Sequence, residues 1–326
     1  MVRKVLVTDY VWPDLRVERE VLSEIGVALL EAPDGEEETL VGLARGVCGI
    51  LTCWARTTRR VIEAALPGLR VIARYGVGLD NIDLAFATAR GIPVTNVPDY
   101  CLRDVAEHTM ALLLALSRKV ARFDRSVRQG VWDIQAGVPL HRLTGRTLGL
   151  VGFGQIAREV VPLARAFGLR VVAFSPSLTP ERAEALGAEA VDLDRLLTES
   201  DFVSVHCPST AQTQGMVGAG MLSKMKPTAY LINTSRGDIV DEEALAEALE
   251  AGRIAGAALD VRGREPPGGG DRLIGMENVI HTPHAAFYSA ESLEELRSRT
   301  AWEVRRVLTG EQPENLVNPE CRSQIG

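Results

Sequence analysis

Short apolar segments alternate with amphipathic segments along almost the whole chain. In the first hundred residues the apolar segments have the length of strands, and the segments between them have helical spacing. Strands are expected at 4–9, 27–31, 48–53, 70–75 and 92–97, and helices at 16–25, 36–45, 58–66 and 82–91. Apolar strands that alternate with helices are typical of a parallel sheet with helices on both faces.

A long helix separates this first series of elements from a second one. Apolar positions between residues 103 and 120 have helical spacing, whereas 130–146 lacks a period and is expected to be a loop. Further strands are expected at 148–151, 170–174, 202–207, 229–234, 254–261 and 278–283, followed by a helix at 289–308. The pattern predicts an α/β fold with two doubly wound parallel sheets, of the Rossmann or flavodoxin-like kind.

Composition narrows the class of function. The 326 residues suit two domains, and the formal charge of −7 makes nucleic acid or an anionic membrane surface an unexpected partner. No apolar run approaches the roughly 18 residues of a spanning helix. The five cysteines are scattered and lack the spacing of a zinc site, so we expect reduced thiols, no metal and a cytoplasmic location.

The strongest local motif is LGLVGFGQIA at 148–157, where an apolar strand runs into a glycine-rich turn and then a helix. Gly152 allows the tight turn, and Gly154 lets the backbone approach a pyrophosphate closely. The helix N-terminus offers N–H groups and the positive end of its dipole to the anion. Ala157 is small enough for the helix to pack on the strand. These flanks favour dinucleotide binding over an incidental strand–helix turn.

The choice of dinucleotide is less defined. An acid that bonds the ribose 2′-hydroxyl is usual about 20 residues after the glycines, but here the strand at 170–174 is followed by Ser175. A serine can bond that hydroxyl without repelling a 2′-phosphate, and Arg182 is the nearest cation. NAD is favoured because no phosphate clamp is visible, and NADP remains possible.

Three later strands each end beside a side chain able to do chemistry. Arg236 follows the strand at 229–234, Glu265 the strand at 254–261, and His284 the strand at 278–283. Because ligands bind outside the carboxyl ends of parallel strands, the guanidinium, carboxylate and imidazole are expected to gather there. Arg236 suits a substrate carboxylate, although pairing with Asp238 or Asp241 on the surface is an equal alternative from its position alone.

The two histidines of VIHTPHAAF have different predicted roles. His281 lies before the strand ends and is expected to be structural, whereas His284 lies beyond it and is the expected acid or base. A metal pair is not expected, because no third ligand has suitable spacing.

Together these motifs resemble the D-isomer-specific 2-hydroxyacid dehydrogenase family. The resemblance rests on GFGQIA, NTSRG, ALDV with a following EP, and TPHAA, and it extends to RYGVGLDNID and DVAEHTMALLLAL, so it spans most of the chain. FSP and TPHAAFYS are similar to the C-terminal-binding protein branch. RYGVGLDNID is similar to D-3-phosphoglycerate dehydrogenases.

The resemblance implies a substrate domain made of 1–100 plus 289–326, a dinucleotide-binding domain at 101–288, and a homodimer. It implies that Arg236, Glu265 and His284 are catalytic, and that Asp260 bonds the nicotinamide amide. Backbone N–H groups of Val77 and Gly78 are implied to bind the substrate carboxylate. The residues implied to line the dinucleotide, with the two motif glycines, are Gly152, Gly154, Gln155, Ile156, Ser175, Cys207, Pro208, Thr213, Thr234 and Asp260.

The expected activity is NAD(P)-dependent hydride transfer between nicotinamide and C2 of a small 2-keto or 2-hydroxy acid. His284 would donate a proton to the developing alkoxide while Arg236 polarises the carbonyl, and Glu265 would favour the charged imidazolium. Phe287 stands where the C-terminal-binding proteins have a tryptophan, so their substrate preference is not implied. The alternatives are a cofactor-sensing protein with little turnover, a D-3-phosphoglycerate dehydrogenase, and an enzyme acting on formate or phosphite.

Overall fold

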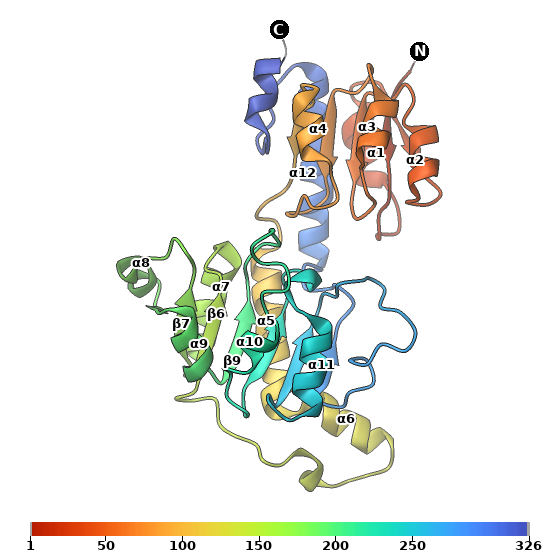
Figure 1. The fold of residues 1–326 in the computed structure, drawn as a ribbon. Helices are drawn as coiled ribbons and strands as arrows, with labels where there is room; N and C mark the ends of the chain where they lie inside the picture. Colours follow the sequence, from red (N-terminus) through yellow and green to blue (C-terminus); the bar gives the residue numbers. More distant parts are fainter. Residues whose placement is uncertain (1, 325–326) are drawn as a thin grey trace. The chain divides into compact units, whose positions relative to one another are not determined.

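The computed structural model describes residues 2–324, which fold as two compact units. Unit 1 takes the chain up to Tyr100 and again from Ser289 onward, and unit 2 is Cys101–Tyr288. The chain therefore leaves unit 1 once and returns to it. In Figure 1 the returning helix, in blue, lies among the red and orange elements of the first hundred residues.

Unit 1 contains a sheet of five parallel strands in the order β2-β1-β3-β4-β5. The strands are β1 (Arg3–Val7), β2 (Val27–Glu31), β3 (Gly49–Thr52), β4 (Val71–Arg74) and β5 (Val94–Thr95). The helices are α1 (Arg16–Ser23), α2 (Glu37–Leu43), α3 (Arg59–Ala65), α4 (Leu84–Ala89) and α12 (Ala290–Thr309), with a 3-10 helix η3 (Pro319–Gln324). This order is that of flavodoxin-like sheets. Helix α12 packs on α1 and β4.

Unit 2 contains a sheet of seven parallel strands in the order β12-β11-β10-β9-β6-β7-β8. The strands are β6 (Thr147–Val151), β7 (Arg170–Phe174), β8 (Glu189–Ala190), β9 (Phe202–Val205), β10 (Tyr230–Asn233), β11 (Gly256–Leu259) and β12 (Val279–His281). The helical elements are α5 (Leu102–Arg118), α6 (Val120–Arg128), η1 (Ile134–Gly137), α7 (Gln155–Ala166), α8 (Pro180–Ala185), α9 (Leu193–Glu199), α10 (Ala219–Leu222), η2 (Gly237–Ile239) and α11 (Glu242–Glu250). The prediction of two doubly wound parallel sheets is confirmed.

The strands of unit 2 are apolar throughout because both faces of the sheet are covered. Leu231 and its neighbour Ile232 are both fully buried, but they belong to separate hydrophobic clusters. Successive side chains of a strand point to opposite faces, so each apolar strand serves two cores.

The switch point of this sheet lies between β6 and β9. From β6 the chain builds β7 and β8 on one side, and then crosses to β9 on the other side. A ligand site is expected outside the carboxyl ends of the strands at such a point. That end of β6 leads directly into Gly152.

The segment after α5 differs from the sequence prediction. The apolar period predicts one helix to residue 120, but α5 ends at Arg118 because Lys119 adopts a left-handed conformation with φ of 52°. Helix α6 follows, and none of its residues is buried. The expected loop at 130–146 contains the short η1 helix. The prediction missed α6, whose half-buried Phe123 packs against Gly137 of η1. Across residues 2–324, no helix is both long and apolar enough to cross a membrane.

Candidate active site

The turn after β6 requires glycine at its first position. Gly152 has φ of 97°, and its N–H donates to the carbonyl of Phe174 at the end of β7 over 2.8 Å. A Cβ on this residue would lie 2.6 Å from the backbone nitrogen of Cys207, which follows β9. Any side chain would therefore push apart the three strand ends that meet at the switch point.

The start of α7 provides the expected anion cradle. Gly154 is the N-cap of α7, and a Cβ built on it meets nothing within 4 Å, so the space in front of the helix is clear. Gln155 is exposed and Ile156 is half-buried at the first turn, whereas Ala157 is fully buried. The N–H groups and the dipole at the start of this twelve-residue helix suit a pyrophosphate.

The other residues expected at the dinucleotide follow neighbouring strands at the same edge of the sheet. Ser175 follows β7, and Cys207 and Pro208 follow β9. The Thr213 hydroxyl donates to the Pro208 carbonyl over 2.7 Å and so holds the loop after β9. Thr234 follows β10, is 8% exposed, and has its hydroxyl 3.0 Å from that of Thr109 in α5. Ligands of such sheets bind at this edge, and contact of these residues with a dinucleotide stays a prediction.

Arg236 lies on the loop after β10. Its carbonyl accepts a hydrogen bond from the Asn233 side chain over 2.9 Å, and its Nη1 donates to the Ser235 carbonyl over 2.8 Å. Asp238 accepts hydrogen bonds from Ser209 and Gln214, and Asp241 caps α11 by accepting from the Ala244 N–H. Both acids named in the surface alternative for Arg236 thus accept hydrogen bonds from other residues.

Gly237 brings the Arg236 loop against the loop that carries Glu265. A Cβ on Gly237 would lie 1.9 Å from the carbonyl carbon of Arg262, a distance that excludes every other residue type there. Arg262 is 8% exposed and pairs with Glu242 over 2.9 Å and with Asp271 over 2.6 Å. This buried, bidentate pairing fixes the second loop beside the first.

Glu265 and His284 form a hydrogen-bonded pair between the loops after β11 and β12. Glu265 Oε2 lies 2.7 Å from His284 Nδ1, and its Oε1 accepts the Arg262 N–H over 2.8 Å. Burial raises the pKa of Glu265, but the hydrogen bond and charge of His284 outweigh this effect and hold that pKa below its ordinary value. Because Nδ1 faces the carboxylate, the predicted proton transfer would use Nε2.

Asp260 holds the His284 loop in place. This residue is 1% exposed, and its carboxylate accepts hydrogen bonds from the Thr282 hydroxyl over 2.5 Å and from the N–H groups of Ala285 and Ala286 over 2.9 and 3.0 Å. The backbone N–H of His284 donates to the Asp260 carbonyl over 2.8 Å. Burial raises the pKa of Asp260, but the hydrogen bonds from His108, Thr282 and the backbone outweigh this effect and hold that pKa below its ordinary value. The expected bond to the nicotinamide amide stays a prediction.

His108 is a site residue that sequence reasoning missed. Its Nε2 lies 3.0 Å from the Thr282 hydroxyl and 3.5 Å from Asp260 Oδ1. His108 is a polar residue among the apolar positions of helix α5, and this contrast was the only sign in the sequence that it has a special role. Its partners are 152 or more residues away along the chain, and spacing alone does not reveal them.

Val77 and Gly78 belong to unit 1 and follow β4. Val77 is 39% exposed, and its carbonyl accepts a hydrogen bond from the Asn96 side chain over 2.8 Å. Gly76 before it has φ of 128°, and a Cβ there would meet the guanidinium of Arg74. Arg74 is 9% exposed and donates to the Tyr75 carbonyl, so it supports this turn from within. The expected contact of Val77 and Gly78 with substrate stays a prediction.

A glycine cradle at a switch point, with a guanidinium and a carboxylate–imidazole pair on the next strand ends, defines a class of protein. It is that of the nicotinamide-dependent α/β oxidoreductases. Comparison with known proteins identifies the family. Residues 110–286 match the model of the D-isomer specific 2-hydroxyacid dehydrogenase NAD binding domain. The chain belongs to this family.

Relatives of known name agree with this family. The glyoxylate reductase of Korarchaeum cryptofilum is 46% identical over 264 residues, which cover 80% of this chain and 79% of the relative. The D-3-phosphoglycerate dehydrogenase of Methanocaldococcus jannaschii is 38% identical over 97% of this chain, but the match spans only 59% of that longer protein. The predicted family is thus confirmed, and the protein is an oxidoreductase that acts on CH–OH donors with NAD(P).

Solved structures share the whole fold. A D-lactate dehydrogenase from Aquifex aeolicus, complexed with NAD and lactic acid, superposes with a TM-score of 0.87 at 28% identity, and covers 97% of this chain and 99% of its own. An acyclic imino acid reductase complexed with NADPH and D-Arg superposes with a TM-score of 0.83 at 29% identity, and covers 96% of this chain. The fold therefore accommodates either nicotinamide cofactor.

Proposed function

We propose that the protein reduces a small 2-keto acid, with glyoxylate as the first candidate, and that it prefers NADH to NADPH. The observation that carries this proposal is the 2.7 Å contact between His284 Nδ1 and Glu265 Oε2, on loops beside the dinucleotide cradle. Glyoxylate is the first candidate because the Korarchaeum cryptofilum relative that bears the name glyoxylate reductase is 46% identical.

Three residues carry the proposed chemistry. Bound nicotinamide supplies the hydride. Protonated His284 gives a proton from Nε2 to the oxygen at C2, and Glu265 keeps the imidazole oriented and charged. The Arg236 guanidinium binds the substrate carboxylate and polarises the carbonyl. In unit 1, the backbone N–H groups of Val77 and Gly78 are proposed as further carboxylate ligands.

The cofactor preference rests on the end of β7. Ser175 is half-buried there and can accept or donate a hydrogen bond to a ribose hydroxyl, while Arg182 is exposed within α8. A 2′-phosphate needs cations held in place, and a single exposed arginine on a short helix is a weak clamp. The other proposed dinucleotide contacts come from Gln155, Ile156, Cys207, Pro208, Thr213, Thr234 and Asp260.

A second candidate substrate is the phosphorylated keto acid that a D-3-phosphoglycerate dehydrogenase would produce. The specific observation in its favour is the 38% identity to the Methanocaldococcus jannaschii enzyme over 97% of this chain. Arg56 is an exposed cation of unit 1 that offers a partner for a phosphate, whereas Arg74 is buried beneath its own turn. A third candidate, a cofactor sensor without turnover, would bind NADH at the same cradle.

Steady-state oxidation of NADH and NADPH with glyoxylate, hydroxypyruvate and 3-phosphohydroxypyruvate tests these candidates together. We expect the highest kcat/KM with NADH and glyoxylate, and a loss of about 10²–10⁴-fold in the His284→Asn variant with NADH affinity unchanged. Asparagine is chosen because His284 has φ of 53°, a left-handed conformation that asparagine tolerates.

Other outcomes would change the assignment. Tight NADH binding without turnover of any keto acid would favour the sensor. A preference for the phosphorylated substrate would favour the second candidate, and near-normal turnover by His284→Asn would remove that histidine from the chemistry.

We propose a homodimer formed through unit 2, located in the cytoplasm. Its support is the apolar surface after α5, where Trp132 is 89% exposed and Ile134 is 72% exposed. Apolar patches of this kind mark interfaces between proteins. Light scattering should give a dimer mass that falls to a monomer mass when both residues are changed to serine.

The proposed location in the cytoplasm is supported by the five scattered cysteines, which suit a reducing compartment.

A further inference from the structure

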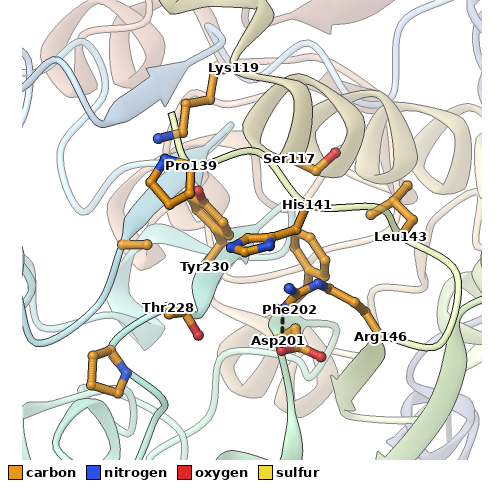
Figure 2. Close-up of a pocket in the computed structure, with 12 residues that line it drawn as sticks. Ser117, Lys119, Pro139, His141, Leu143, Arg146, Asp201, Phe202, Thr228 and Tyr230 are labelled. Carbon is orange, nitrogen blue, oxygen red and sulfur yellow. Dashed lines mark hydrogen bonds and ion pairs between the residues drawn. The ribbon is translucent and has the colours of Figure 1, made fainter. Parts of the chain in front are cut away.

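Unit 2 has a pocket at the edge of its sheet opposite to the dinucleotide cradle. Its volume is about 140 Å³, and its lining comes from the end of α5 and from segments that lead into β6, β9, β10 and β11. The residues before parallel strands meet at the amino edge of the sheet, whereas Gly152 and Arg236 follow the strands at the carboxyl edge. Figure 2 shows its lining side chains, which include none of the proposed catalytic or cofactor residues.

The inner walls of the pocket are apolar. The rings of Phe202 and Tyr230 stack with centroids 5.6 Å apart and an angle of 16° between their planes. Phe202 is 2% exposed, and Leu143 and Pro139 contribute aliphatic surface. A cavity of about 150 Å³ holds one benzene ring, so the volume suits a single ring or a branched aliphatic group.

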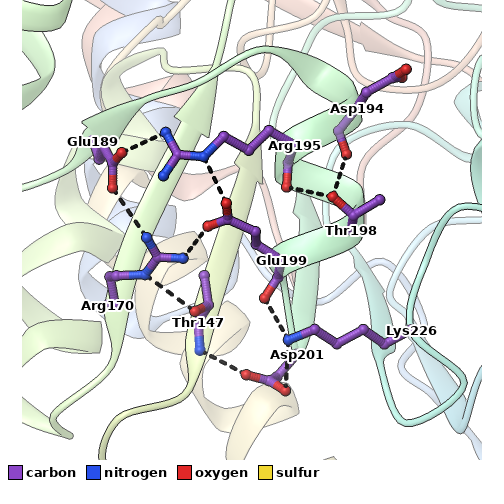
Figure 3. Close-up of polar contacts among 9 residues, drawn as sticks. All are labelled: Thr147, Arg170, Glu189, Asp194, Arg195, Thr198, Glu199, Asp201 and Lys226. Atoms are coloured by element: carbon purple, nitrogen blue, oxygen red, sulfur yellow. Dashed lines mark hydrogen bonds and ion pairs between the residues drawn. The ribbon is translucent and has the colours of Figure 1, made fainter.

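The acidic side chain at the pocket is neutralised within the fold. Asp201 accepts hydrogen bonds from Arg146 Nη1 over 2.9 Å, from the Thr147 N–H over 2.9 Å and from Lys226 Nζ over 3.3 Å. Burial raises the pKa of Asp201, but these three donors together hold it below its ordinary value. Figure 3 shows Lys226 and Thr147 at this carboxylate. Arg146 lines the pocket beside Asp201, so the charge of this carboxylate is balanced there.

Positive charge at the pocket comes from Lys119. Within residues 2–324 no hydrogen bond or ion pair joins the side chains of Lys119 and His141 to other groups, although both line the pocket. Lys119 has φ of 52°, a left-handed conformation that usually selects Gly or Asn after a helix and that is strained for a lysine. Burial, with a smaller contribution from Arg122, lowers the pKa of Lys119, as expected for a partly enclosed amine without a counter-ion.

We propose that this pocket binds a small aromatic monocarboxylate, with its ring beside Tyr230 and Leu143 and its carboxylate at Lys119 and His141. An apolar chamber selects a hydrophobic body, and unpartnered cationic and imidazole groups select one anionic head. Inorganic phosphate lacks the hydrophobic body, and a neutral alcohol lacks the charge. This inference concerns the amino edge of the sheet and does not depend on the proposed keto-acid chemistry.

Calorimetric titration of the full chain with benzoate tests the site. It is performed with and without saturating NADH, so that binding in the cofactor cleft is recognised. We expect benzoate to bind in both conditions, at least tenfold more tightly than benzyl alcohol or inorganic phosphate. The Lys119→Gly variant removes the charge and relaxes the left-handed backbone, so it should fold and bind benzoate at least tenfold more weakly.

Two further variants control for charge and for fold. Lys119→Arg keeps the cation and should retain binding, and Lys224→Met, which removes an exposed lysine paired with Asp194, should bind benzoate as the unmodified chain does. The proposal is overturned if benzoate shows no saturable binding, if NADH displaces it, if phosphate or benzyl alcohol binds equally well, or if Lys119→Gly binds as tightly as the unmodified chain.

Discussion

At the scale of one residue, Glu265 orients the imidazole of His284, the proposed acid. Its carboxylate accepts a hydrogen bond from the backbone N–H of Arg262 and lies beside the imidazole Nδ1 of His284. Each oxygen therefore has its own donor, and the second oxygen is positioned by the first. The sequence indicated that both residues lie at strand ends, but the fixed orientation depends on the Arg262 backbone.

We expect Glu265→Gln to move the pH–rate profile of keto-acid reduction toward lower pH and to lower kcat by roughly 10-fold or more. The amide keeps the size of the side chain but removes the charge that favours the imidazolium. Stopped-flow or steady-state rates between pH 5 and 9 measure the shift. Glu243→Gln is the control, because Glu243 is an exposed partner of Arg272, and the glutamate role fails if both variants give the profile of the unmodified chain.

His206 makes a separate prediction about stability. Burial lowers the pKa of His206 to about 4 from an ordinary 6.5, and its Nε2 lies 2.9 Å from the Ser204 hydroxyl. As pH falls through 6.5 the unfolded chain binds a proton that the folded chain does not, so the free energy of unfolding falls until about pH 4. The loss from this group is up to about 3 kcal/mol.

Urea unfolding of the unmodified chain and of His206→Asn, at steps between pH 7 and 4.5, measures this contribution. The unmodified chain should lose stability more steeply than the variant as the pH is lowered. Equal slopes would mean that His206 titrates alike in the folded and unfolded chains.

At the scale of elements, the contact between η2 and the loop after β11 decides the geometry of the site. Gly237→Ala places a methyl group where the Arg262 backbone lies, so the loop carrying Glu265 must shift. We expect kcat/KM to fall by about 10²-fold or more while circular dichroism stays unchanged, since a misplacement of 1 Å is enough for such a loss. Gly220→Ala in α10 is the matched control, because its Cβ meets nothing within 4 Å, and a similar loss in that variant would refute the argument.

The sequence predicted the positions of strands and helices better than it predicted the side-chain contacts between them. The apolar runs located β2 and β7 to the residue, because turn-forming residues stand beside them: Gly26 precedes β2, and Ser175 and Pro176 follow β7. Strand β5 is two residues long where six were expected, since an apolar run does not distinguish pairing from simple burial. The contacts of His108 with Thr282 and Asp260 could not be predicted, because they join distant segments through side chains alone.

At the scale of the whole molecule, each unit contains its own complete sheet, but only unit 2 is continuous along the chain. Unit 1 depends on α12 for more than apolar cover. Glu18 of α1 is fully buried, and its carboxylate pairs with Arg297 of α12 over 2.9 Å. Without the last segment this carboxylate would be buried and uncompensated, at a cost of about 3–5 kcal/mol.

Residues 101–288 are therefore expected to fold alone and to bind NADH with an affinity within about threefold of the whole chain, but without turnover of keto acids. Residues 1–100 alone are expected not to fold. Fluorescence titration with NADH and amide exchange check both expectations. A folded fragment 1–100, or failure of fragment 101–288 to fold, would show that the units do not divide as the contacts indicate.

The return of the chain to unit 1 also sets an order of assembly during translation. Arg297 leaves the ribosome 279 residues after Glu18, so the buried glutamate of α1 has no counter-ion from α12 until the intervening unit has emerged. Nascent polypeptides usually mature from the amino terminus onward. Here unit 2 can fold first, and the first segment of unit 1 becomes native only after its second segment has been made.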